Sequence, residues 1–185
     1  MKQYHLERTN LSTRALKFLL VLHDADACQE ESIGTLCVLA EELHSGAIAG
    51  GTIIDGRGAT FERVVFPSLQ PSPFSILSHS PVAPPYIGTC AQALCEDRIV
   101  VCPDVATDTR FDAGWRRLYL DFGLRSVQSA PVFGCNGKPL GTFVMALREP
   151  GASFDPEVTG FGAYAMWTIL QNRQPGASPP PKDVA

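Results

Sequence analysis

The C-terminal half of the chain contains the segment GLRSVQSAPVFGCNGKPLGTFVMALRE, residues 123–149. Two largely apolar runs, residues 125–133 and 139–147, flank the dipeptide Asn136-Gly137. Asn-Gly between two such runs is a strong local signal for a hairpin, because both residues tolerate the positive φ that tight hairpin turns require. The segment therefore predicts two long antiparallel strands.

A helix with an aromatic face is predicted before this hairpin. Its apolar residues recur at helical intervals: Phe111, Trp115, Leu118, Tyr119 and Phe122. This spacing places them on one side of a helix, which Gly123 can end. Further upstream we expect a short helix beginning at Thr89 and a strand over residues 98–102.

The N-terminal half predicts a second helix and a second hairpin. Apolar residues form a helical stripe between Ile33 and Leu43. Strands are expected over residues 47–54 and 59–66, around a turn rich in glycine. The last helix has a clear start, because Asp155 can cap it and Pro156 suits its first position.

These elements predict an α+β fold in a single domain over residues 28–173, with one central antiparallel sheet. Residues 67–87 contain six prolines and several serines, which exclude a long regular element. Such a loop is either a lid or binding loop or a solvated connection, and the sequence leaves both open. Residues 1–27 are expected to include a helix, and residues 174–185 to form a disordered Pro/Gly/Ser tail.

Composition narrows the range of functions. The chain has 185 residues, 45% of them hydrophobic, which is enough for one core. Its net charge of -4 comes with scattered basic residues and predicts no binding to nucleic acid or to a membrane surface. The apolar run of residues 18–22 is too short for a signal peptide or a membrane span. We therefore expect a cytoplasmic protein.

Short motifs between residues 88 and 131 resemble those of a known family. They are Gly88-Thr89-Cys90-Ala91-Gln92-Ala93, then Pro103-Asp104-Val105, then Gly-Leu-Arg-Ser-Val-Gln-Ser-Ala-Pro at residues 123–131. In this order they are similar to the GAF domains attached to bacterial sensor histidine kinases and diguanylate cyclases. Ala91 stands where that family favours glycine, and Val127-Gln128 replace Cys-Trp. Both departures fall in segments that border the ligand cavity in the family, which leaves the ligand open.

The resemblance implies a GAF-like central antiparallel sheet of about six strands with helices on both faces. It also implies a sensory module for signal transduction that binds a small molecule and is not an enzyme, with no cofactor and no metal. In this fold the terminal helices, here residues 10–22 and 156–173, pack side by side. We therefore expect a homodimer through them, and a histidine kinase or another signalling protein as a possible partner.

Six residues are candidates for ligand binding: Cys90, Phe111, Trp115, Arg125, Gln128 and Ser129. Arg125 can offer a fork of donors to an anionic ligand, and Gln128 and Ser129 can offer neutral hydrogen bonds. The alternative for Arg125 is a salt bridge to Asp104 or Asp121. Because successive strand residues face opposite sides, Arg125 and Gln128 cannot both point into one cavity unless a bulge intervenes.

A thiol-based function is the alternative. Cys90 would lie in the first turn of a helix, where the helix dipole lowers a thiol pKa, and Cys95 or Cys102 would assist it. The other interpretation of Cys90 is a small buried apolar residue. Free methionine-(R)-sulfoxide reductases share this fold but carry a further cysteine before the strand that begins here at Arg125, where this chain has none. The spacing of Cys90, Cys95 and Cys102 matches no usual zinc motif.

Overall fold

The structure is a computed structural model that describes residues 28–69 and 77–171. The predicted helix of residues 10–22 and the predicted tail of residues 174–185 lie outside this range. Five strands form one sheet in the order β2-β1-β5-β4-β3, and every neighbouring pair is antiparallel. The strands are β1 (Ile48–Ile54), β2 (Phe61–Val65), β3 (Val100–Cys102), β4 (Ser126–Phe133) and β5 (Pro139–Leu147).

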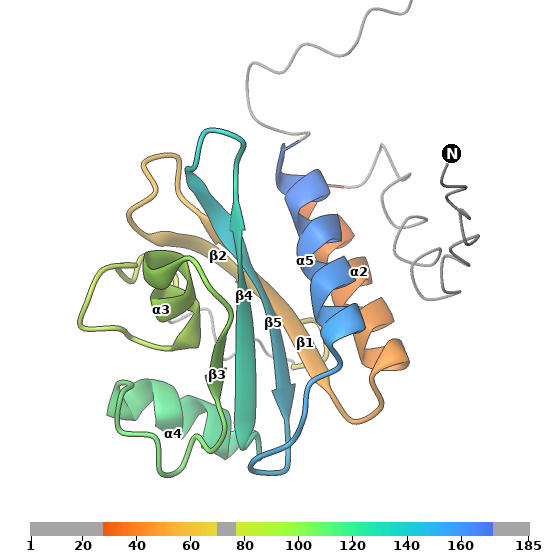
Figure 1. Cartoon of the computed structure of the whole chain (residues 1–185), viewed down its shortest axis with the longest axis vertical. Coiled ribbons are helices and arrows are strands. Elements are labelled where there is room, and N and C mark those ends of the chain that lie inside the picture. Colours follow the sequence, from red (N-terminus) through yellow and green to blue (C-terminus); the bar gives the residue numbers. More distant parts are fainter. Residues whose placement is uncertain (1–27, 70–76, 172–185) are drawn as a thin grey trace, which may run out of the picture.

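Helices cover both faces of the sheet (Figure 1). They are α2 (Gln29–Leu43), α3 (Thr89–Glu96), α4 (Ala113–Asp121) and α5 (Pro156–Gln171). The pair α2 and α5 lies side by side on one face, and α3 and α4 lie on the other. The predicted α+β fold is confirmed, with five strands described where about six were expected. Within the described part of residues 67–87, backbone pairing beside β2 includes the isolated bridge Thr60–Pro81 and the hydrogen bonds of Phe61 with His79 and Ser80. Such short pairing agrees with the prolines there.

The hairpin of β4 and β5 sorts side chains between the two faces. In the hairpin turn only Gly137 of the Asn136-Gly137 pair takes a positive φ, of 75°. Along β4, Val127 belongs to the core under α3 and α4, whereas Gln128 contacts α5. Because side chains alternate along a strand, Ser129 faces the same side as Val127. One strand therefore contributes to both layers.

Glycines let the α2 and α5 layer approach the sheet closely. A Cβ on Gly51 in β1 would lie 2.8 Å from the Ile33 side chain of α2. A Cβ on Gly162 in α5 would lie 2.4 Å from the Phe143 ring of β5. On the opposite face, a Cβ on Gly50 would lie 2.4 Å from the Phe66 ring. Real Cβ atoms do not approach so closely, so these three positions accept only hydrogen in this packing.

Side-chain caps fix where α4 and α5 begin. Asp112 Oδ1 accepts hydrogen bonds from the amides of Gly114 (2.7 Å) and Trp115 (3.1 Å). Asp155 Oδ1 accepts from the amides of Glu157 (2.9 Å) and Val158 (3.3 Å), which confirms the predicted cap of the last helix. Among the helices of residues 28–69 and 77–171, none is long and apolar enough to cross a membrane.

Candidate functional site

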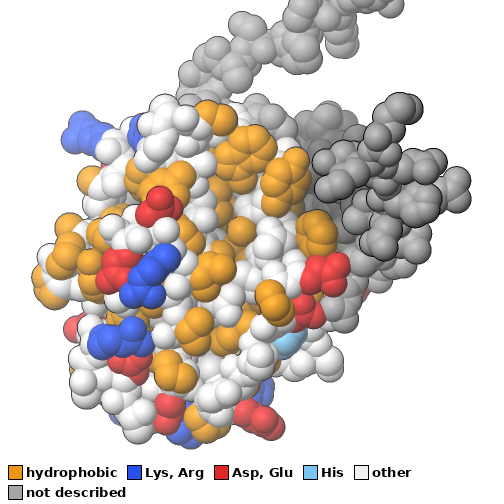
Figure 2. All heavy atoms as spheres, in the orientation of Figure 1, with side chains coloured by type: hydrophobic (Ala, Val, Ile, Leu, Met, Phe, Trp, Pro, Cys, Tyr) orange, Lys and Arg blue, Asp and Glu red, His pale blue; other side chains and the backbone are white. Residues whose placement is uncertain are grey.

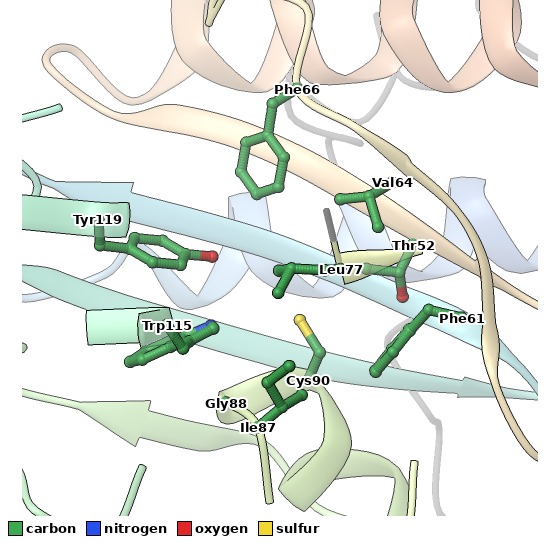
Figure 3. Close-up of a pocket in the computed structure, with 10 residues that line it drawn as sticks. All are labelled: Thr52, Phe61, Val64, Phe66, Leu77, Ile87, Gly88, Cys90, Trp115 and Tyr119. Atoms are coloured by element: carbon green, nitrogen blue, oxygen red, sulfur yellow. The ribbon is translucent and has the colours of Figure 1, made fainter. Parts of the chain in front are cut away.

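A pocket lies between the sheet and the helices α3 and α4 (Figure 3). Its lining side chains come from β1, β2, α3, α4 and the loops that precede α3. None of the lining residues is charged at neutral pH. They are Thr52, Phe61, Val64, Phe66, Leu77, Ile87, Gly88, Cys90, Trp115 and Tyr119.

Aromatic rings of α4 form one wall of the pocket. The ring centroids of Trp115 and Tyr119 lie 4.6 Å apart, and Phe111 packs 5.0 Å from Trp115. A Cβ on Gly88 would lie 2.1 Å from Trp115 Nε1, so only glycine at the N-cap of α3 lets the indole take this position. The glycine that opens the Gly-Thr-Cys motif is thus explained by its contact with the aromatic wall.

Hydroxyl groups border the pocket beside Cys90. Thr89 Oγ1 and Ser129 Oγ are 2.8 Å apart, and both residues are fully buried. Cys90 Sγ lies 3.4 Å from the same Ser129 oxygen. On the neighbouring strands, Thr52 Oγ1 and Thr142 Oγ1 are 2.8 Å apart. Each hydroxyl can donate or accept a hydrogen bond, so these four hydroxyls can pair with a donor or with an acceptor.

The Cys90 thiol is not activated. Desolvation raises its pKa above the ordinary value, and the hydrogen bonds from Ser129, Thr142 and Thr89 offset this only in part. Its position in the first turn of α3 therefore does not produce the low pKa that the helix dipole alone predicts. At neutral pH the sulfur carries its proton, and either the thiol or the Ser129 hydroxyl can donate in their contact.

The other two candidate thiols are also protonated at neutral pH. Burial raises the pKa of Cys102 to about 12, and the nearby Asp108 carboxylate adds to the rise. Desolvation and then the charge of Glu96 raise the pKa of Cys95, whose Sγ lies 3.2 Å from the carbonyl oxygen of Val82. The cysteines of residues 28–69 and 77–171 are all free. In that same part of the chain, no three His, Cys, Asp or Glu side chains are grouped to hold a metal ion.

Two predicted ligand-binding residues lie away from the pocket. Arg125 forms a two-pronged ion pair with Asp104, with Nε–Oδ1 and Nη2–Oδ2 distances of 3.0 Å each, as the alternative interpretation proposed. Gln128 lies on the opposite face of the sheet, where its Nε2 donates to Thr159 Oγ1 at 3.0 Å. Both expectations are corrected, because Asp104 takes up the Arg125 donors and strand alternation turns Gln128 toward α5.

The remaining candidates are brought together. Cys90 and Trp115 line the pocket. Ser129 Oγ contacts Thr89 Oγ1 and Cys90 Sγ at its border, and the Phe111 ring packs against the Trp115 ring. The sequence analysis did not single out the lining residues of β1, β2 and the loops. Thr52 could have been found as a polar residue within an apolar strand, and Tyr119 from its place on the aromatic face of α4.

The pocket is nearly filled. The space open to the centre of a water molecule is about 10 Å³, which is room for about one water. Leu77 contributes to this filling: Figure 3 shows its side chain among Phe66, Tyr119 and Cys90. A larger guest therefore requires a lining side chain to move.

The antiparallel sheet, the helices on both faces and the uncharged pocket define an α+β domain with a small pocket on one face. The family model of the GAF domain matches residues 44–161, which is more than half of the chain. The chain therefore belongs to the GAF domain family. A comparison with curated proteins found no match.

Solved structures with the same fold include sensors and enzymes. The chain is similar to a putative GAF sensor protein from Burkholderia vietnamiensis, with 15% identity, TM-score 0.61, and coverage of 86% of this chain and 90% of that one. It is also similar to fRMsr of Staphylococcus aureus in its reduced form, with 16% identity, TM-score 0.63, and coverage of 92% and 98%. A third similar structure is free methionine-R-sulfoxide reductase from Neisseria meningitidis, with 18% identity, TM-score 0.58, and coverage of 86% of this chain and 90% of that one. At these identities the likeness shows the fold alone.

Proposed function

We propose that this GAF domain is a sensory module that binds a small molecule in the pocket beside Cys90 and does not catalyse a reaction. The observation that carries the proposal is an uncharged pocket, walled by Trp115 and Tyr119 and bordered by buried hydroxyls, whose thiol has a raised pKa. Apolar walls with a few convergent polar groups are typical of ligand sites. A cytoplasmic setting, with a histidine kinase or another signalling protein as partner, fits this role.

A thiol redox module or a reductase like those among the structural relatives is the second candidate. Cys90 in the pocket favours it, since the fold is shared with such enzymes. The raised pKa of Cys90 weighs against it, because the attacking group is the thiolate and a raised pKa lowers its share. The pKa values of Cys95 and Cys102 are raised as well.

The signal would cross the sheet through β4. Ser129 bonds Thr89 on the pocket side, and its neighbour Gln128 donates to Thr159 of α5 on the other side. Thr159 also lies 3.7 Å from the Met145 sulfur of β5, so α5 is tied to two strands. A ligand that moves α3 against β4 would thereby favour one position of α5, by at most its difference in affinity for the two positions.

The proposed output surface is the outer side of α5. Tyr164 is 54% exposed and stacks on Trp167, with ring centroids 5.8 Å apart. Pro156, Gly160, Phe161 and Tyr164 line an open groove along the same helix. Figure 2, drawn in the orientation of Figure 1, shows apolar side chains gathered over α5. We expect a second copy of the chain to cover this surface, and Tyr164→Asp to shift a dimer toward monomer in sedimentation analysis.

Native mass spectrometry of freshly purified protein, followed by a thermal-shift panel of metabolites, tests the binding function. A ligand that binds only the folded state raises its stability, by about 2.7 kcal/mol at a concentration of one hundred times Kd. We expect at least one compound to do so, and its binding to leave all thiols reduced. A rapid, stoichiometric oxidation of Cys90 by a substrate would instead favour the redox alternative.

A further inference from the structure

We propose that the pocket binds a neutral, mainly apolar molecule about the size of one aromatic ring, and that the Leu77 side chain competes with it for the same space. This inference rests on the proposed binding function and names the chemical class of the ligand. It follows from the charges, the polar groups and the space in and around the pocket.

Charge is absent from the pocket lining and from the chain segment that supplies more than half of it. Each lining side chain is uncharged at neutral pH. From Val64 to Cys95 the chain contains no Asp, Glu, Lys or Arg. Just beyond this stretch, Glu96 pairs with Arg98 and Asp104 pairs with Arg125. A charged ligand would lose its hydration here without meeting an opposite charge, and burial of an unpaired charge is strongly unfavourable.

Neutral polar groups border the pocket beside Cys90, and the Tyr119 hydroxyl and the Trp115 indole N–H add two more on the aromatic wall (Figure 3). Ser129 Oγ is shared by Thr89 Oγ1 at 2.8 Å and Cys90 Sγ at 3.4 Å, and the Thr52–Thr142 pair lies on the adjoining strands. These neutral groups suit one hydroxyl, carbonyl or amide of a ligand. The rest of the lining consists of aromatic and aliphatic side chains, which suit a ring.

Space for a ring exists only if Leu77 moves. The residue is half-buried and packs against the core under α3 and α4. It lies in a short turn closed by the hydrogen bond from Ser80 N to Leu77 O (3.0 Å), outside every strand and α-helix. Its side chain is therefore held less firmly than those of the sheet. Truncation of a leucine in apolar surroundings leaves a cavity, and such cavities stay dry and accept benzene.

The test compares Leu77→Ala with the unchanged chain and with Leu118→Ala. Leu118 is also half-buried against the same core but does not line the pocket, so it is a matched control. Three probes share one ring and differ in charge at pH 7: benzyl alcohol, benzoate and benzylammonium. Binding is measured by calorimetry and by the change in melting temperature.

We expect benzyl alcohol to bind Leu77→Ala at least about tenfold more tightly than it binds the unchanged chain or Leu118→Ala, because the side chain no longer competes. Benzoate and benzylammonium should bind the same variant at least about tenfold more weakly than benzyl alcohol. Should Leu77→Ala fail to fold, Leu77→Val carries the same comparison with a smaller gain.

Equal binding of charged and neutral probes would overturn the ligand class. No gain from truncation of Leu77, or the same gain from Leu118→Ala, would overturn the competition. The failure of the broader function looks different: neither a co-purified molecule nor any compound of a metabolite panel would then stabilise the protein. A charged metabolite that binds the pocket would leave the sensory function standing and refute only this inference.

Discussion

The two faces of the sheet are built on different principles. Between the sheet and the helices α2 and α5, the packing is solid: Phe143 and Met166 are almost fully buried, and Gly162 brings α5 onto a phenyl ring. Between the sheet and the helices α3 and α4, buried hydroxyls and the Cys90 thiol border a small pocket, and a side chain outside the regular elements lies in it. We expect the core under α2 and α5 to resist rearrangement, and the pocket under α3 and α4 to rearrange when a ligand binds.

Truncation of the solid face should have the largest effect. Met166 is 0% exposed and belongs to the core between α2, α5 and the sheet. We expect Met166→Ala to lower the free energy of unfolding by about 2–5 kcal/mol, because it removes buried contacts and leaves a cavity. Tyr164→Ala on the exposed side of the same helix should change it by about 0.5 kcal/mol or less in the monomer. Urea unfolding measures both, and similar losses would contradict the contrast.

A pair of glycines tests the close contact of α5 with the sheet. A Cβ on Gly162 would lie 2.4 Å from the Phe143 ring, whereas a Cβ on Gly160 would meet nothing within 4 Å. Gly162→Ala should therefore destabilise the fold by about 1–3 kcal/mol through overpacking. Gly160→Ala should stabilise it by up to about 1 kcal/mol, the gain in helix propensity. Thermal unfolding gives the sign of each change, and a gain at both positions would disprove the tight contact.

The hydroxyl group of the pocket face should matter less to stability. Ser129→Ala leaves Thr89 Oγ1 and Cys90 Sγ without their shared partner, at a cost of about 1–2 kcal/mol. The same variant removes a hydrogen bond that lowers the Cys90 pKa, so that pKa should rise further. Thr168→Ala, which removes a hydroxyl that donates to the Tyr164 carbonyl on the exposed side of α5, serves as control. A loss at Thr168 as large as that at Ser129 would argue against a special role for the buried group.

Thiol reactivity should distinguish the two faces most finely. At pH 8 the exposed Cys28 and Cys135 should react with iodoacetamide at least about tenfold faster than Cys90 or Cys37, since only the thiolate attacks and burial raises the pKa of both slow thiols. The reaction rates of Cys90 and Cys37 should keep increasing as the pH rises above the ordinary pKa of a thiol. Leu77→Ala should accelerate Cys90 but not Cys37, which lies in the solid core. Mass spectrometry reads each site, and a fast Cys90 in the unchanged chain would revive the redox alternative.

Local patterns in the sequence were enough to predict most of the fold. The Asn136-Gly137 turn, the Asp155 cap and the aromatic face of α4 all depend on near neighbours, and the structure contains each of them. The site was predicted less well. Leu77, Thr52 and Cys90 come together around the pocket only through tertiary packing. Arg125 has its ion-pair partner 21 residues away, at Asp104. The local periodicity of the sequence cannot predict such contacts.

Two adjacent glycines in β1 should not tolerate substitution. Gly50 is pressed by the Phe66 ring from one layer, and Gly51 by Ile33 and Met166 from the other. A saturation library should therefore show two neighbouring positions that reject every substitution for unrelated reasons. Their suppressors should not overlap: a smaller residue at position 66 would rescue Gly50→Ala alone, and one at position 33 would rescue Gly51→Ala alone.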